Sequence, residues 1–122
     1  MNVLDAERLV VERTARVCHE ANRAYCAAHG DNSHLPWEET PGAIRESAAD
    51  GVQHALRNPF ATPGEMHANW MAFKKEQGWT YGPEKDIAKK THPCFLPYGE
   101  LPAHEKAKDM IFLAIVRATM TS

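Results

Sequence analysis

The sequence lacks any apolar run long enough to cross a membrane. A transmembrane helix needs about 20 consecutive apolar residues, and the most apolar segment, Ile111 to Ala118, is interrupted by Arg117. The first residues include Asp5, Glu7 and Arg8 instead of the basic cluster and apolar core of a signal peptide. We therefore expect a cytoplasmic protein with no membrane partner. The chain alone cannot form a channel pore.

Cysteines are few, and their positions form no metal-binding pattern. The chain has 3 of them, Cys18, Cys26 and Cys94, and no two stand at a metal-ligand spacing. They are expected to be reduced structural thiols. An EF-hand is also excluded, because the run Asp31-Asn32-Ser33 lacks the glycine and the closing glutamate of that loop. The sequence thus predicts no metal, no calcium site and no other cofactor.

A large net charge is absent. The 14 Lys and Arg residues are set against 16 Asp and Glu residues, which gives a net charge of −2 and argues against bulk binding to nucleic acid. The distribution is uneven, because every lysine lies between Lys74 and Lys108 and every arginine lies outside that window. We therefore expect one face of the protein to be locally positive.

Recognisable catalytic signatures are missing as well. The phosphate-binding patterns GxxxxGK[ST] and GxGxxG do not occur. His92-Pro93-Cys94 places a histidine near a cysteine, but residues this close in sequence rarely bring their side chains into productive contact, and no third orienting group is evident. His19-Glu20 does not begin an HExxH motif, because Arg23 occupies the place of the second histidine. A non-enzymatic protein is expected.

What the chain does contain is a set of helix signals. Apolar residues recur at three- and four-residue spacing, and Thr40-Pro41 and Thr62-Pro63 each place an N-cap residue before a proline at the first helical position. Trp79-Thr80-Tyr81 alternates and predicts a very short strand. The fold class is therefore mainly α, with about four helices and one or two very short strands. The predicted helices run from Leu4 to Ala28, from Pro41 to about Arg57, from Pro63 to Gln77 and from Pro102 to about Met120.

Between these helices lies an ordered set of short motifs. They are Asn58-Pro59, Thr62-Pro63-x-Glu65-x-His67-x-Asn69-Trp70, Gly78-Trp79-x-Tyr81-Gly82, Lys85-Asp86, Lys90-Thr91-His92-Pro93, Tyr98 and Lys106-x-Lys108-Asp109. In this order and spacing they resemble the ryanodine receptor repeat, the RyR domain, from about Pro36 to Ala118. The chain then divides into an N-terminal helix outside the likeness, residues 1–34, packed on a RyR-like domain, residues 35–122. Its size and Ala/Arg-rich first helix point to a small stand-alone prokaryotic or phage member.

The resemblance implies a mainly α fold and a role in regulation or assembly, because these repeats are peripheral modules of large channels. Trp70 is expected to be largely buried where two apolar stripes of its helix meet. His67, three residues earlier, is either a ligand contact or a satisfied core histidine. The residues assigned to the structural family motif are Asn58, Pro59, Thr62, Pro63, Trp70, Gly82, Pro93 and Tyr98.

A candidate ligand site lies in the aromatic and basic loop after the third helix. Aromatic faces can stack on a planar base, and lysines supply point charges for phosphate. We therefore predict a module that binds a small phosphorylated or nucleotide-like molecule. The alternative is that the aromatic residues fill the core while the lysines form a solvated loop. The predicted ligand-binding residues are Trp79, Tyr81, Lys85, Lys89, Lys90 and His92.

A second function remains open, that of a structural protein-interaction or dimerisation module without a small-molecule ligand. Met110 to Ala118 is apolar on nearly every face, so the last helix must be covered on more than one side. A homodimer would provide that cover, and it is the commonest closed assembly. The opposing interpretation is that the N-terminal helix covers this segment within one chain.

Overall fold

The computed structural model describes residues 2–121, with side chains placed for residues 2–119. The described chain is mainly α, as predicted, and its only sheet is a pair of two-residue strands. None of the described helices is long and apolar enough to pass through a bilayer. The α-helices are α1 (Val3–Ala28), α2 (Gly42–Arg57), α3 (Pro63–Glu76) and α4 (Ala103–Thr121). The short elements are the 3₁₀ helices η1 (Trp37–Glu39) and η2 (Tyr98–Glu100) and the strands β1 (Thr80–Tyr81) and β2 (Thr91–His92).

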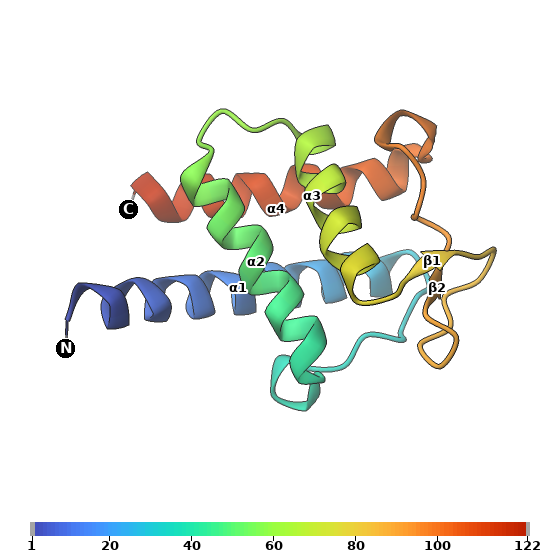
Figure 1. Cartoon of the computed structure of the whole chain (residues 1–122), viewed down its shortest axis with the longest axis horizontal. Coiled ribbons are helices and arrows are strands. Elements are labelled where there is room, and N and C mark those ends of the chain that lie inside the picture. Colours follow the sequence, from blue (N-terminus) through green and yellow to red (C-terminus); the bar gives the residue numbers. More distant parts are fainter. Residues whose placement is uncertain (1, 122) are drawn as a thin grey trace.

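The helices pack in two pairs (Figure 1). The long helices α1 and α4 run in opposite directions along the molecule, and α2 and α3 cross over them. The segment with β1 and β2 lies at one end, near the end of α1 and the start of α4. This leaves all four helices and the β segment able to contribute side chains to one central region.

The apolar side of every helix meets in a common core. Its two largest fully buried side chains are Val52 of α2 and Val116 of α4. Leu113 of α4 is 2% exposed, and α1 packs along the same helix. The face of α4 that carries Leu113 and Val116 is therefore covered within one chain by α1, α2 and α3, whereas Met110 and Ala114 stay exposed. Other core residues are Val11, Ala15, Cys18, Ala55, Ala61 and Met66.

The predicted start of α3 is confirmed, whereas that of α2 is wrong. The Thr62 hydroxyl accepts a hydrogen bond from the Glu65 backbone N–H at 3.2 Å, and Pro63 follows it at the first helical position. Thr40 does not cap α2, which begins at Gly42 without a side-chain cap. The Thr40 hydroxyl instead donates to the Pro36 carbonyl at 2.8 Å, so it stabilises the preceding 3₁₀ turn.

The two strands form a parallel pair, with Thr80 opposite Thr91 and Tyr81 opposite His92. Thr91 also fixes the loop between them. Its backbone N–H donates to the Asp86 carbonyl at 3.1 Å, and its hydroxyl donates to the Glu84 carbonyl at 3.1 Å. The loop that carries Lys85 is thereby held to β2, which places it beside the central region.

Candidate ligand-binding cavity

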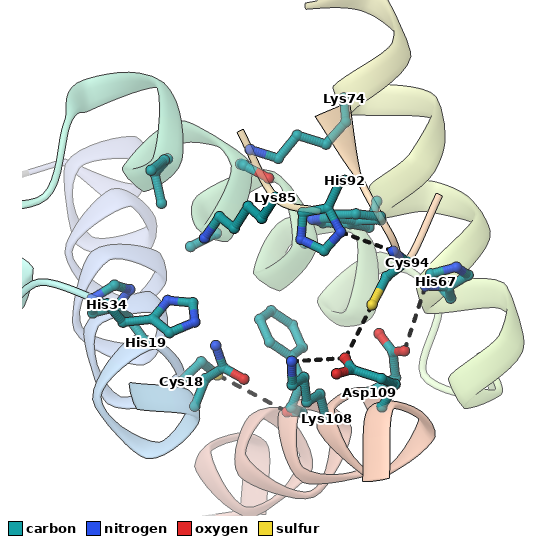
Figure 2. A pocket seen from close by; sticks show the side chains of 18 of the residues that line it. Cys18, His19, His34, His67, Lys74, Lys85, His92, Cys94, Lys108 and Asp109 are labelled. Atoms are coloured by element: carbon teal, nitrogen blue, oxygen red, sulfur yellow. Dashed lines mark hydrogen bonds and ion pairs between the residues drawn. The ribbon is translucent and has the colours of Figure 1, made fainter. Parts of the chain in front are cut away.

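A cavity of about 390 Å³ lies between the helices and the β segment. Its wall includes residues from α1, α2, α3, α4 and the loops after α1 and α3. Small-molecule sites typically measure about 300–1,000 Å³ and combine an apolar lining with a few polar groups. Figure 2 shows such a mixture, with lysine, histidine and acidic side chains around the opening. The cavity is therefore the candidate site.

Aromatic rings form one part of the wall. Trp79 is 9% exposed, and the ring of Trp70 meets that of His92 edge-on with centroids 5.0 Å apart. Phe112 of α4 also lines the cavity. Most of the Trp70 surface is covered, in agreement with the expectation that this residue is largely buried. It faces the cavity, and part of its surface is therefore left uncovered.

Three lysines from three different elements line the same cavity, namely Lys74 of α3, Lys85 of the loop and Lys108 of α4. Lys74 is 8% exposed, and its ammonium lies 5.2 Å from the centroid of the Trp79 ring. Burial, and secondarily Lys85, lowers the pKa of Lys74. The Lys108 ammonium is held 2.7 Å from the Glu105 carboxylate.

Two of these lysines lack an acidic partner. Among the residues whose side chains the structure places, no carboxylate comes within 4.0 Å of the Lys74 or the Lys85 ammonium. A buried ammonium without a counter-charge is costly. Asp31, Glu105 and Asp109 also line the cavity, but none of them pairs with Lys74, whose buried ammonium a bound anion would neutralise.

Neutral histidines accompany the lysines. Burial lowers the pKa of His92 to about 4, with Lys85 and Lys108 adding to the shift. Its Nδ1 accepts a hydrogen bond from the Cys94 backbone N–H at 3.0 Å, so the neutral ring carries its proton on Nε2. Burial and Lys85 also lower the pKa of His34. Both rings are uncharged near neutral pH and can form hydrogen bonds with a ligand.

The structure brings together half of the predicted ligand-binding residues. Trp79, Lys85 and His92 line the cavity, whereas Tyr81, Lys89 and Lys90 do not. Tyr81 is 53% exposed. Lys90 has a left-handed backbone, φ 55°, and its ammonium donates to the Gln77 carbonyl at 2.7 Å. Lys90 thus contacts the end of α3 instead of the cavity.

Sequence reasoning missed Lys74 and Lys108. Lys74 follows Trp70 by one helical turn, so both residues lie on the same face of α3, and that spacing was the available signal. Lys108 belongs to the Lys106-x-Lys108-Asp109 motif, which carried no functional interpretation. Contacts between α3, α4 and the loop cannot be inferred from helix periodicity alone.

Most of the family-motif residues have structural roles. The Asn58 side chain donates to the His54 carbonyl at the end of α2, at 2.9 Å. The Tyr98 hydroxyl donates to the Lys106 carbonyl at 3.3 Å. Pro93 and Trp70 differ from these residues, because both line the cavity.

His67 is a buried histidine with partners on both ring nitrogens. It is 4% exposed, with Nε2 2.7 Å from the Leu96 carbonyl oxygen and Nδ1 3.7 Å from the Asp109 carboxylate. Burial raises the pKa of Asp109 to about 7, although Lys108 acts in the opposite direction. These contacts agree with the interpretation of His67 as a satisfied core histidine. His67 is also one of the residues that line the cavity.

The family model for the RyR domain matches residues 45–119. The match covers more than half of the chain and includes α3, the β segment and most of α2 and α4. The chain belongs to the RyR domain family.

Proposed function

We propose that this RyR-domain protein is a non-enzymatic, cytoplasmic module that binds a small phosphorylated or nucleotide-like molecule in the central cavity. The observation that carries the proposal is the buried Lys74 ammonium, which lines the cavity without a carboxylate partner among the described side chains. An isolated protein gains nothing from burying an uncompensated charge. A ligand with an anionic group would supply the missing counter-charge.

Other side chains that line the cavity would also lie near the bound anion. Lys74 and Lys85 extend in the same direction past His92, and Lys108 approaches from the α4 side (Figure 2). Lysine acts as a point charge toward phosphate and does not require the planar geometry of arginine. Lys74 and Lys85, which have no carboxylate partner among the described side chains, together with Lys108, whose charge is shared with Glu105, suit a phosphate group better than a single carboxylate.

The aromatic wall supports a planar group on the same ligand. Trp70, Trp79 and Phe112 all line the cavity, and stacking of a base on an aromatic side chain is worth about 1–3 kcal/mol. Such stacking tolerates different bases, because every base has a π face. We therefore assign a nucleotide-like class of ligand and leave the base unspecified.

The reactive groups of the cavity support binding over covalent catalysis. Burial, a hydrogen bond to Glu105 and its charge raise the pKa of the Cys94 thiol to about 12. Its Sγ donates to the Glu105 carboxylate at 3.0 Å. A thiol with such a raised pKa is a poor nucleophile, because the thiolate is the reactive form.

A thermal-shift screen tests the proposal with nucleoside mono-, di- and triphosphates, the parent nucleosides and inorganic phosphate. A ligand that binds only the native state at a hundredfold excess over its Kd stabilises it by about 2.7 kcal/mol. We expect a shift from at least one phosphorylated compound and a smaller or absent shift from its parent nucleoside. Equal shifts from nucleoside and nucleotide, or no shift from any phosphorylated compound, would contradict the proposal.

A second candidate function, self-association, rests on a separate observation. Val3, Val10 and Val17 recur at seven-residue spacing along α1 and are 82%, 44% and 54% exposed. Residues seven apart lie on nearly the same face of a helix. This unpartnered stripe is a candidate surface for a second copy of the chain.

A further inference from the structure

A cluster of metal-ligating side chains lies next to the cavity, at the end of α1. Cys26 belongs to the last turn of that helix, and Asp31 and His34 follow it in the connecting segment. One ligand atom from each residue lies within 4.8 Å of the other two. Asp31 and His34 also line the cavity. The spacing Cys-x₄-Asp-x₂-His is not a familiar metal motif, and the three residues come together only through the turn after the helix.

The carboxylate of Asp31 is already oriented for a ligand. Its Oδ1 accepts hydrogen bonds from the Ser33 backbone N–H at 3.0 Å and from the Ser33 hydroxyl at 2.6 Å. Its Oδ2 is left on the other side, 3.5 Å from Nε2 of His34. Hydrogen bonds of this kind orient the ligands in metal sites and are part of their design.

The distances between the donor atoms approach those of a tetrahedral zinc site. Zinc bonds of about 2.3 Å to sulfur and 2.0–2.2 Å to nitrogen or oxygen place neighbouring donor atoms about 3.3–3.6 Å apart. The Asp31–His34 distance of 3.5 Å already falls in that range. With all donors within 4.8 Å of one another, the Cys26 distances must shorten by about 1.2 Å at most. Rotation of the side chains can provide a movement of that size.

We propose that Cys26, Asp31 and His34 bind a divalent transition-metal ion of the zinc class. The mixed sulfur, nitrogen and oxygen donors suit Zn²⁺, whereas Mg²⁺ and Ca²⁺ prefer oxygen ligands alone. When the metal–sulfur bond forms, the Cys26 thiol releases its proton to solvent. The thiolate and the carboxylate then balance the two positive charges of the ion. Three protein ligands leave one position of a tetrahedral site for water or another ligand.

The surroundings both favour and oppose a cation. Burial and Lys85 lower the pKa of His34, so its imidazole is neutral near pH 7, as a metal ligand must be. Burial raises the pKa of Cys26, and Lys108 counters part of that shift. Both lysines repel a cation, but the Lys108 ammonium is paired with Glu105 at 2.7 Å, which reduces its effect. The site is thus expected to need the thiolate, and loss of Cys26 is expected to remove most of the affinity.

Titration of the full chain with Co²⁺ tests the proposal, because the absorption spectrum of bound Co²⁺ depends on its ligands. We expect one Co²⁺ per chain with a thiolate-to-cobalt charge-transfer band, and displacement of the band by Zn²⁺. Cys26→Ser and His34→Asn should each abolish the band or weaken cobalt binding at least about tenfold. Cys94→Ser is the matched control, since its thiol bonds Glu105 outside the cluster, and it should leave the band unchanged.

Circular dichroism of each variant separates lost ligation from lost folding. Cys26 is 2% exposed, so Cys26→Ser risks disturbing the core, whereas His34 is only half-buried. A folded His34→Asn protein that keeps the full charge-transfer band would overturn the assignment. So would a band that disappears in Cys94→Ser, or the absence of any band in the unsubstituted chain. Lys74 distinguishes the two sites, because it lines the cavity and is not one of the three proposed metal ligands, whereas Lys85 and Lys108 lie near both sites.

Discussion

Gly82 lies so close to Thr91 that a methyl group added to it would be 2.5 Å from the Thr91 Cβ. This contact joins the two ends of the loop that carries Lys85. Gly82 donates its backbone N–H to the His92 carbonyl at 3.3 Å, and Thr91 donates to the carbonyls of Glu84 and Asp86. The requirement for glycine is therefore one of space, and it serves to position a cavity-lining lysine.

The first prediction concerns this contact. Gly82→Ala should destabilise the protein by about 1–3 kcal/mol, because the new methyl group overlaps Thr91 and both strands must move apart. The matched control is Gly99→Ala, since a Cβ at Gly99 would meet nothing within 4 Å. Urea denaturation measures both variants. A Gly82→Ala protein as stable as the Gly99→Ala control would refute the steric explanation.

The second prediction concerns the buried Lys74. Lys74→Met should raise the stability of the ligand-free protein by about 1 kcal/mol, because the unpaired ammonium costs more than its contact with Trp79 returns. The same variant should weaken binding of a phosphorylated ligand about tenfold to a hundredfold, since a hydrogen bond to a charged group contributes about 1.5–3 kcal/mol. Thermal melting and calorimetric titration measure the two effects.

Three further variants complete that test. Lys85→Gln should also weaken binding, because Lys85 lines the cavity. Lys75→Gln and Lys89→Gln are matched controls, because both lysines are exposed and lie outside the cavity lining. If the control variants lose as much affinity as Lys74→Met and Lys85→Gln, the charge of the whole surface, and not the cavity, determines binding.

Features of the fold and of the cavity that depend on residues close together in the sequence could be predicted from it, whereas features that depend on distant residues could not. The start of α3 is local, since Thr62, Pro63 and Glu65 form it within one turn, and the sequence predicts it correctly. The direction of the Lys85 and Lys90 side chains is not local. One points to the cavity and the other to Gln77, because Lys90 adopts a left-handed backbone that neighbouring residues do not predict.

The third prediction concerns the acid dependence of stability, through Asp109. Burial raises its pKa in the folded protein from an ordinary 3.8 to about 7. The folded state therefore binds the proton more tightly, and this group stabilises the fold at low pH and loses that effect as the pH rises toward 7. Asp109→Asn should remove this dependence. Its stability relative to the unsubstituted protein should be higher at pH 8 than at pH 4, as measured by urea denaturation at each pH.

His92 provides the opposite dependence and a control for the method. Its pKa is lowered from an ordinary 6.5 to about 4, so the unfolded state binds the proton more tightly. This group therefore costs stability as the pH falls from 6.5 toward 4. His92→Gln should make the protein more resistant to acid than the unsubstituted chain, whereas Asp109→Asn should make it less resistant. If the stability of both variants changed with pH in the same way as that of the unsubstituted protein, neither group would titrate as proposed.

The last prediction is self-association, for which the fold changes the expected surface. The face of α4 that carries Leu113 and Val116 is covered by α1, α2 and α3, which leaves only Met110 and Ala114 of its apolar segment exposed beside Ala118. An exposed apolar stripe also lies on α1, at Val3, Val10 and Val17. Light scattering at micromolar concentration should give twice the single-chain mass of 13.7 kDa. A mass near 13.7 kDa at every concentration would exclude the dimer.

Substitutions on the two helices locate the contact. Val10→Lys combined with Val17→Lys places charges on the α1 stripe and should convert the dimer to monomer, because desolvating unpaired charges opposes association. Met110→Lys combined with Ala114→Lys is the matched control on α4, where Met110 is 57% exposed and Ala114 is also exposed. Dissociation by the α4 pair and not by the α1 pair would place the interface on the last helix, as the sequence first suggested.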